Sequence, residues 1–334
     1  IQRSRGLGDV YKRQVLMSLS LFLDEALGAG RASDDTVSAL SALAVAAIEI
    51  AGLVQRNGIS ADLGEEIGGT NSDGDSQKAL DVRAEELITH HLSTSGAAFL
   101  LSEEQDDPVP LAGDGSVIVA VDPLDGSSNI SVNVTIGTIF SILPAGPMLQ
   151  PGRNQLAAGF FTYGPQTTLI LAFAQGGCQC FVLDPDQGEF LTMGGPVSIP
   201  EQTSEFAINA AYSNHWFPPV RAWMDGVLEG KSGPYKQSYR MRWVGSLVAD
   251  AWRIFQRGGV FLYPGDDRPG NGQGRLRLVY EASPMAFLAE RAGAIATDGS
   301  GSILEIEPDS LHQRVPLIFG CLLYTSPSPR DLWI

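Results

Sequence analysis

The sequence of 334 residues predicts an α/β protein, a layered sandwich of helices and sheets with two subdomains. Three patterns predict this class. Apolar residues at helical spacing precede the first strand-like segments, apolar runs separated by turn residues fill 137–190, and strands alternate with helices after Pro200. Because the pattern changes there, we expect a boundary near residue 205, between subdomains 17–205 and 206–320.

The first half of the chain predicts two helices followed by two strands. The helices show a broad apolar face, and the run VIVAV is typical of a strand buried on both faces. In order, we expect a helix that is capped by Asp34 or Asp35 and ends at Asn57, a helix over 77–92, and strands over 99–101 and 117–121.

The second half predicts an antiparallel meander and then alternating elements. Residues 137–190 contain GTIFSIL, AAGFFTYG, TTLILAFAQGG and QCFVLD, which read as consecutive strands. After it we expect a helix over 246–257 that Gly258 ends, a strand over 276–280, and a helix over 284–291 that Gly293 ends.

Composition excludes several classes of protein. Hydrophobic residues make up 44% and charged residues 18%, which excludes a disordered chain. The net charge of −16 argues against nucleic acid or an anionic membrane surface as the main partner, and favours cations. No apolar run is expected to reach the ~20 residues of a membrane helix. Three cysteines form no disulfide framework, so we expect a cytoplasmic protein.

The two ends do not continue the pattern of their neighbours. Residues 1–16 and 321–334 lack helical or strand periodicity, and we expect both to be non-native sequence. Residues 15–23 imitate the apolar part of a signal peptide, but Asp24 and Glu25 follow at once without a small-residue cleavage site.

Four carboxylates follow two of the predicted strands. Glu103 and Glu104 come after the first of these strands, and Asp122 and Asp125 come after the second. Neighbouring strands bring such ends together, and the repulsion between close carboxylates is relieved by a divalent cation. An all-oxygen set favours Mg²⁺, with Mn²⁺ as a substitute, and the four histidines are poorly spaced for zinc. The alternative is an ordinary turn, since Asp-Pro and Asp-Gly are common turn dipeptides.

The segment after Asp125 favours phosphate chemistry. Gly126, Ser127 and Ser128 can point successive backbone N–H groups at an anion, directly beside the acidic residues. Together the two features indicate metal-assisted phosphoryl transfer.

Three further carboxylates have both a structural and a functional interpretation. Asp75 is expected near the start of the second helix, where it could be only an N-cap, and Asp81 could be a solvated helix residue. Glu281 follows the expected strand 276–280, at a strand end where a lone glutamate could be structural.

Longer motifs now resemble those of class 1 fructose-1,6-bisphosphatases. They are GDSQKALD (74–81), SEE (102–104), VDPLDGSSNISVNVTIGTIFSI (121–142), RWVGSLVAD (242–250), GGVFLYP (258–264), GRLRLVYEASPMAFLAERAGAIATDG (274–299) and LHQRVP (311–316). The resemblance covers about residues 17–320. The wider lithium-sensitive phosphatases, inositol monophosphatase included, share only the DPLDG-like part. The resemblance implies the α-β-α-β-α sandwich of the sugar phosphatase fold.

The resemblance also implies roles for individual residues. The magnesium sites would comprise Glu103, Asp122, Asp125, Glu281, Asp75 and the backbone carbonyl of Leu124. Asp81 and Glu104, with Asp75 beside them, would act in catalysis by accepting a proton from the attacking water. Asp125, Gly126, Ser127 and Ser128 would hold the 1-phosphate. The sugar and its 6-phosphate would be held by Asn209, Tyr212, Tyr263, Arg275 and Arg277, and by Arg242 reaching across a dimer interface.

The physical chemistry of the substrate agrees with these roles. A 6-phosphate that is not cleaved needs fixed positive groups, and arginines supply forked donors. The alternative for these arginines is surface solubility. Trp243 stands where many members have tyrosine, and Arg275 where lysine is common. Ser116, Val117 and Pro144 replace the vertebrate-type AMP-site residues, so we expect weak or absent AMP inhibition by that route.

The expected function is Mg²⁺-dependent hydrolysis of the 1-phosphate of D-fructose 1,6-bisphosphate, giving fructose 6-phosphate in gluconeogenesis or the Calvin cycle. The expected assembly is a homotetramer, a dimer of dimers, with no nucleic-acid or membrane partner. One alternative is a sedoheptulose 1,7-bisphosphatase or a dual-specificity enzyme. Another is a catalytically silent regulator that binds metal or sugar phosphate.

Overall fold

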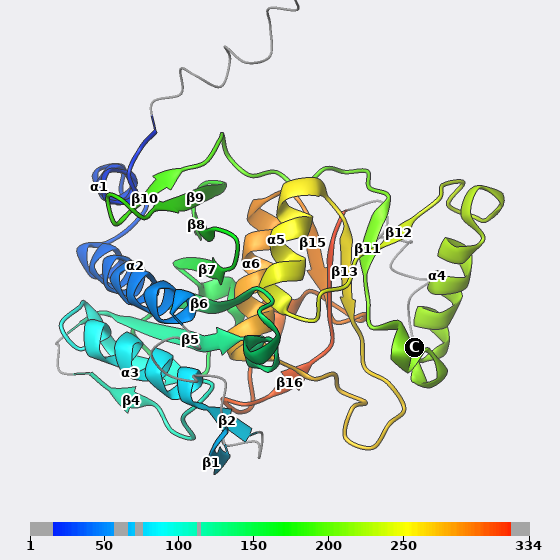
Figure 1. Cartoon of the computed structure of the whole chain (residues 1–334), viewed down its shortest axis with the longest axis horizontal. Helices are drawn as coiled ribbons and strands as arrows, with labels where there is room; N and C mark the ends of the chain where they lie inside the picture. The colour runs from blue at the N-terminus through cyan, green and yellow to red at the C-terminus, as the bar shows by residue number, and fades with distance from the viewer. Residues whose placement is uncertain (1–15, 57–65, 71–75, 112–114, 322–334) are drawn as a thin grey trace, which may run out of the picture.

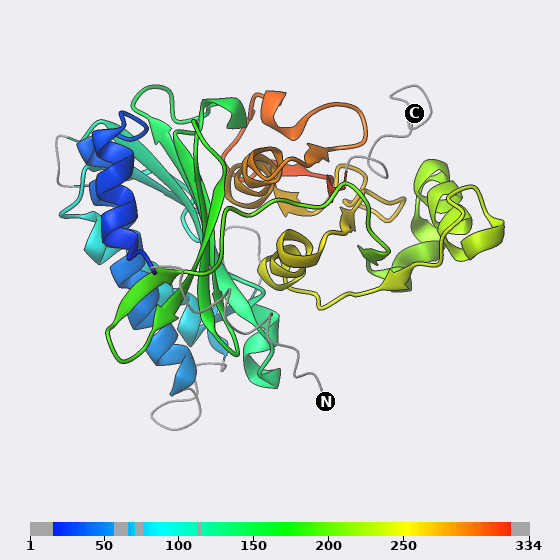
Figure 2. The ribbon, with the colours of Figure 1, turned by 90° about the horizontal axis from the view of Figure 1, so that it is seen from above.

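The computed structural model describes residues 16–56, 66–70, 76–111 and 115–321. Within these ranges, helices and sheets alternate in five layers in the order α-β-α-β-α (Figure 1; Figure 2). The predicted α/β class and layered sandwich are therefore confirmed.

The larger sheet has eight strands in the order β10-β9-β8-β7-β6-β5-β3-β4. Its strands from β6 to β10 form the predicted antiparallel meander, β5 pairs with β6 antiparallel, and β3 pairs with β5 in parallel. The bounds are β3 (Ala97–Ser102), β4 (Val109–Pro110), β5 (Val117–Asp125), β6 (Ile136–Pro144), β7 (Ala157–Tyr163), β8 (Thr167–Phe173), β9 (Cys178–Asp184) and β10 (Glu189–Thr192). A separate two-stranded sheet comprises β1 (Glu66–Thr70) and β2 (Ser76–Lys78).

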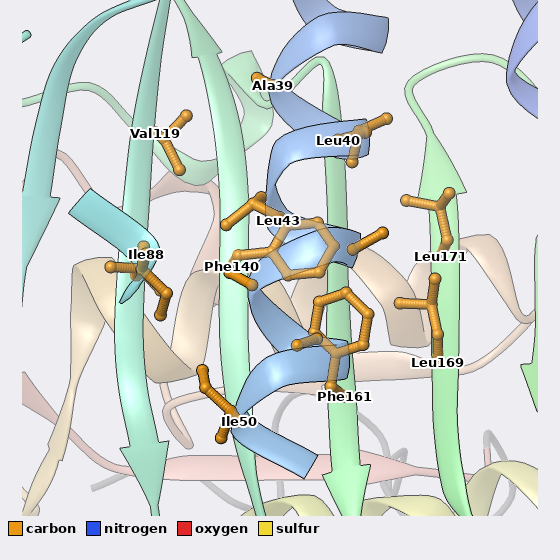
Figure 3. Packing of buried hydrophobic residues seen from close by; sticks show 14 of the residues in the cluster. Ala39, Leu40, Leu43, Ile50, Ile88, Val119, Phe140, Phe161, Leu169 and Leu171 are labelled. Carbon is orange, nitrogen blue, oxygen red and sulfur yellow. The ribbon is translucent and has the colours of Figure 1, made fainter. Parts of the chain in front are cut away.

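Three helices cover one face of the larger sheet. They are α1 (Leu19–Gly28), α2 (Asp34–Gln55) and α3 (Ala79–Leu92). In α2, Leu40 and Leu43 lie against Phe140 and Phe161 of the sheet (Figure 3). Helix α1 was not expected, because its apolar residues resemble the core of a signal peptide; here Leu23 is buried against the sheet.

The start of α2 differs from the prediction. Ser33, and neither Asp34 nor Asp35, is the N-cap, and its hydroxyl accepts from the N–H of Thr36 at 3.2 Å. Asp35 is directed outward to Ser116, whose N–H donates to its carboxylate at 2.9 Å. Ser33 caps the helix from an extended backbone conformation, so the carboxylate of Asp35 is available to connect α2 to Ser116 at the start of β5.

Helix α2 also corrects the expectation about apolar runs. Over its 22 residues an 18-residue window has a mean hydropathy of 2.1, which by length and composition alone is enough to cross a membrane. Its buried positions are largely small or branched, including four alanines from Ala39 to Ala47, and they pack on the sheet and on α3. The apolar composition of α2 thus serves close packing in the core.

Two helices separate the larger sheet from the smaller one (Figure 2). They are α5 (Leu247–Arg257) and α6 (Ser283–Arg291), which contact β6 and β7 on one side and β13, β15 and β17 on the other. The smaller sheet has the order β12-β11-β13-β17-β15. Its strands are β11 (Glu205–Ala207), β12 (Arg240–Met241), β13 (Val260–Tyr263), β15 (Ile295–Thr297) and β17 (Leu317–Gly320).

The last layer is α4 (Pro218–Leu228), which buries Trp223 and Val227 against Phe206 and Leu262 of the smaller sheet. A short ribbon of β14 (Leu276–Arg277) and β16 (Arg314–Val315) packs against residues 278–282. The predicted strand 276–280 is therefore wrong beyond Arg277. A π-helical turn, η6 (Leu278–Ala282), replaces it and continues into α6.

Candidate active site

Three buried carboxylates meet at the end of β5. Asp122 and Asp125 come from β5 and Glu281 comes from η6, and one oxygen of each lies within 4.8 Å of the others. All three residues are less than 9% exposed. Asp75, which the sequence also placed here, lies outside the described residues.

The parallel pairing of β3 and β5 brings the remaining acid to this place. Ser102 is paired with Val121, and the N–H of Glu103 donates to the carbonyl of Val121 at 3.1 Å. Glu103 therefore follows β3 at the level where Asp122 lies in β5. The expected convergence of the two strand ends is what the structure shows.

An irregularity in β5 separates Asp122 from Asp125. The register with β6 shifts between these two residues, so that Pro123 and Leu124 bulge out of the ladder. The hydroxyl of Thr138 donates to the carbonyl of Pro123 at 2.8 Å and bonds with the hydroxyl of Tyr163. The N–H of Leu124 donates to the carboxylate of Asp122 at 3.0 Å. Hydrogen bonds to Thr138 and to Asp122 thus stabilise the bulge at Pro123 and Leu124.

Glu281 reaches the cluster because of the π-helical turn. Its carboxylate accepts from the backbone N–H of Arg277 at 2.5 Å. The guanidinium of Arg277 is 3% exposed and lies 3.7 Å from the carboxylate of Glu103. Arg277 therefore borders the acidic cluster, a position that neither its charge nor its spacing in the sequence could indicate.

Burial raises the pKa of every carboxyl in the cluster, and repulsion between carboxylates adds to the shift for Glu103, Asp122 and Glu281. Loss of water raises the pKa of Asp125 to about 6 and, with the nearby charge of Asp125, that of Glu281 to about 7. The pKa values of Glu103 and Asp122 are raised well above their usual range, first by burial and then by neighbouring carboxylates. The positive charges of Arg277 and Arg314 oppose the shift at Glu281 but do not cancel it.

The cluster fits a divalent metal cation. Its donors are hard oxygens, and a cation would relieve both the desolvation and the repulsion that raise the pKa values. The histidines lie elsewhere: His91 bonds with Glu49, His215 with Asp267, and His312 with the carbonyl of Gln105.

The segment after β5 turns sharply at Gly126. This residue has φ +78°, and a Cβ there would lie 2.9 Å from the Cβ of Ser246. Both the left-handed backbone and the close approach favour glycine. Ser127 and Ser128 then begin a short 3-10 helix, η2 (Ser127–Val132), next to Asp125. A turn of this kind directs successive backbone N–H groups to one place, and here it follows directly on Asp125.

Asp81 and Glu104 lie on elements that border the cluster. Asp81 is 5% exposed in the first turn of α3, and Glu104 is half-buried directly after Glu103. The N–H of Glu104 donates to the hydroxyl of Ser102, which in turn donates to Glu85 at 2.7 Å.

Glu85 was not expected from the sequence. It is 8% exposed, and burial raises its pKa. The sequence does contain a signal for its burial. Glu85 lies four residues after Asp81, on the same face of α3 as the apolar residues Leu80, Ala84 and Ile88.

A second group of predicted residues gathers near Tyr263. Tyr263 is half-buried beside Trp243, with ring centroids 5.9 Å apart. Burial raises its pKa, and the positive charges of Arg275 and Arg268 oppose this shift. The guanidinium of Arg268 lies 3.5 Å from the ring centroid of Tyr212.

Arg268 was not singled out from the sequence, because its stacking partner is more than fifty positions away. Asn209 caps the short helix η4 (Ala210–His215) that carries Tyr212, accepting from the N–H of Ala211 at 3.1 Å. These residues form a region of aromatic and cationic groups that suits an anion.

Comparison with known proteins identifies the family. Residues 19–194 match the family model described as the fructose-1-6-bisphosphatase N-terminal domain, and residues 199–326 match the C-terminal domain. The chain belongs to the fructose-1,6-bisphosphatase family. The chain is 49% identical over 314 residues to a class 1 fructose-1,6-bisphosphatase of Azorhizobium caulinodans, covering 91% of this chain and 95% of the relative.

Two other proteins agree with this assignment. A class 1 fructose-1,6-bisphosphatase of Cereibacter sphaeroides is 51% identical over 294 residues, covering 86% of this chain and 88% of the relative. The crystal structure of Leishmania major fructose-1,6-bisphosphatase in holo form superposes with a TM-score of 0.86 at 30% identity, covering 93% of this chain and 97% of that one.

In this fructose-1,6-bisphosphatase, Arg242 lies on an exposed part of the surface. Arg242 is exposed, and its backbone N–H donates to the carbonyl of Phe206 at 2.7 Å. Met241 and Val244 beside it are 45% and 41% exposed. Its guanidinium donates to the carbonyl of Met241 at 3.0 Å. Among the described residues of this chain, the guanidinium makes no contact with the acidic cluster.

The raised pKa values predict that a metal ion stabilises this fructose-1,6-bisphosphatase more strongly as pH rises. Without divalent metal, the folded chain keeps protons that the unfolded chain has released between pH about 4 and about 7. The free energy of unfolding therefore falls as pH rises through this window. Thermal unfolding in chelator should show a lower Tm at pH 7.5 than at pH 5.5, and Mg²⁺ should remove most of the difference. Equal Tm values with and without Mg²⁺ at pH 7.5 would contradict the prediction.

Proposed function

We propose that this protein hydrolyses the 1-phosphate of D-fructose 1,6-bisphosphate with water, in a Mg²⁺-dependent reaction, to give fructose 6-phosphate and phosphate. The observation that carries the proposal is the buried cluster of Asp122, Asp125 and Glu281, with the turn at Gly126 directly beside it. Membership of the family supports the substrate.

The metal ions would be held by carboxylates, of which Asp122, Asp125 and Glu281 already lie together. Their ligands would be Glu103, Asp122, Asp125, Glu281, Asp75 and the carbonyl of Leu124. When bound, Mg²⁺ supplies positive charge to the phosphoryl oxygens and to the leaving alkoxide, and Mn²⁺ is the expected substitute.

Residues of this chain would orient the reactants and accept the proton. Asp81 and Glu104 would accept the proton of the water that attacks phosphorus. This role is supported by the burial of Asp81 in the first turn of α3 and by the position of Glu104 directly after Glu103. The backbone N–H groups of Ser127 and Ser128, with Gly126, would bind the reacting phosphate.

The other phosphate needs cationic and hydroxyl donors, because no metal is required where no bond breaks. Asn209, Tyr212, Tyr263 and Arg275 would supply them. Arg277 was also predicted to bind this phosphate. Its buried place beside Glu103 favours a different role, which is to balance the charge of the cluster.

The exposed position of Arg242 supports a site shared between subunits. We infer that Arg242 reaches the 6-phosphate of a neighbouring copy, in a homotetramer built as a dimer of dimers. We also propose that subdomains 17–205 and 206–320 both contribute residues to each site. The enzyme would act in the cytoplasm.

Phosphate release tests the function directly. Initial rates should be measured with fructose 1,6-bisphosphate, sedoheptulose 1,7-bisphosphate and inositol monophosphate, each with Mg²⁺ and with chelator. Fast release from the fructose substrate alone, abolished by chelator, is the expected result. Comparable release from the sedoheptulose substrate would indicate dual specificity. No release by the folded protein would leave the silent regulator as the explanation.

A further inference from the structure

The segment 241–250 connects an exposed surface to the acidic cluster. It begins at Met241 and Arg242, which are exposed, and continues into α5, where Ser246 is 2% exposed and Asp250 is 1% exposed. No residue of this segment except Arg242 has a role in the proposed reaction so far. Residues 245–248 nevertheless contact Asp125 and the helix η2.

The segment contacts the end of β5 through one carboxylate. Asp125 accepts from the hydroxyl of Ser246 at 3.1 Å and from the N–H of Val248 at 2.9 Å. Both bonds go to the same oxygen of Asp125, which fixes the rotation of that carboxylate. The position of α5 thus determines how Asp125 presents its other oxygen.

A further contact reaches the turn after β5. The side-chain amide of Asn129 donates to the carbonyl of Gly245 at 3.0 Å, and Gly126 packs so tightly on Ser246 that a Cβ would not fit. The bend at 244–246 therefore contacts both the metal-binding strand end and the helix η2.

Asp250 holds the bend itself. Its carboxylate accepts from the N–H of Val244 at 3.0 Å and from the N–H of Gly245 at 3.1 Å. These donors precede Ser246, the N-cap of α5, so Asp250 does more than complete the helix end. The hydroxyl of Ser246 bonds only weakly to the N–H of Ala249, at 3.4 Å, while it donates to Asp125.

We propose that Asp250 is a positioning residue that fixes the bend at 244–246 and, through Ser246 and Val248, the carboxylate of Asp125. The bend begins two residues after Arg242, whose own backbone N–H is bonded to the carbonyl of Phe206. The inference rests on the proposed function and deepens it.

Three substitutions separate positioning from charge. Asp250→Ala removes the acceptor, Asp250→Asn keeps one acceptor oxygen at nearly the same place, and Asp250→Glu keeps the charge but moves it by one methylene. Asp298→Ala is the matched control, because Asp298 also accepts two backbone N–H bonds, from Ser300 at 2.6 Å and Gly301 at 2.7 Å, away from the cluster.

The main readout is Mn²⁺ binding to the full-length protein, measured by calorimetry without substrate. We expect Asp250→Ala to weaken Mn²⁺ at least about tenfold, as loss of an outer-shell contact commonly does. Asp250→Asn should stay within about threefold of the wild type, and Asp250→Glu should be weaker than Asn. Asp298→Ala should bind Mn²⁺ like the wild type, even where its Tm falls.

The outcomes distinguish this inference from the proposed function. Wild-type affinity in Asp250→Ala overturns the inference, and so does a Glu variant that binds better than the Asn variant, since that pattern indicates charge. If the Ala variant does not fold, the order of Asn and Glu decides. The proposed function fails separately, when the wild type binds Mn²⁺ but releases no phosphate.

Discussion

The Asp122→Asn variant is expected to lose at least about 10³-fold in the rate of phosphate release, while remaining folded. The amide has the same shape but one charge less, so a metal ion in the cluster would be bound weakly and misplaced. Metal ions contribute several kcal/mol of transition-state stabilisation, and a loss of ~4 kcal/mol corresponds to about 10³-fold. Initial rates at saturating Mg²⁺ and substrate measure the effect.

Stability gives this prediction a second, opposite readout. Asp122 is buried among carboxylates that raise its pKa, so removing its charge relieves repulsion in the metal-free protein. We expect the Tm of Asp122→Asn in chelator at pH 7.5 to equal or exceed that of the wild type. Asp225→Asn on the exposed surface of α4 is the matched control and should change neither rate nor Tm. An active Asp122→Asn enzyme would rule out the assigned cluster.

The Arg242→Ala variant is expected to raise KM for fructose 1,6-bisphosphate by about 10- to 100-fold with little change in kcat. A charged hydrogen bond to phosphate contributes about 1.5–3 kcal/mol. The contact is remote from the bond that breaks, so it binds ground state and transition state alike. Steady-state kinetics measure the split. Arg257→Ala, another exposed arginine near the end of α5, should leave KM unchanged.

Mixed subunits test whether Arg242 acts across an interface. Subunits that carry Arg242→Ala keep an intact acidic cluster, and subunits that carry Asp122→Asn keep the arginine. When the two are unfolded, mixed and refolded together, hybrid dimers should contain sites with wild-type KM that neither parent has. If mixing gives only the high KM of the arginine variant, the shared site is wrong.

Local patterns in the sequence were sufficient to predict much of the site. Asp122 and Asp125 end an apolar run of strand length, and a glycine turn follows, so both strand and turn were visible in consecutive residues. The meander from β6 to β10 was equally local, because each strand pairs with the next along the chain. Parallel pairing of β3 and β5 then brought Glu103 to the place expected.

Contacts between distant segments were not visible in the sequence. Residues 276–280 alternate like a strand, but Leu278 to Ala282 form a π-helical turn that leads into α6, and Glu281 is buried there. Glu85 and Asp250 acquire their partners through tertiary folding. The apolar residues on their helix faces indicate burial, but not which groups the two carboxylates bond. Arg277 likewise carries the charge of an anion-binding residue, but its environment is the acidic cluster.

The apolar helix α2 has a consequence for how the protein is made. Residues Asp34–Gln55 leave the ribosome early, whereas the strands that cover them extend to Phe173. At about 5–20 residues per second, the helix waits roughly 6–24 s for those strands to be synthesised. During that interval a segment with mean hydropathy 2.1 is exposed to other nascent chains and to chaperones. We therefore expect the yield of folded protein during translation to depend on how well this segment is protected.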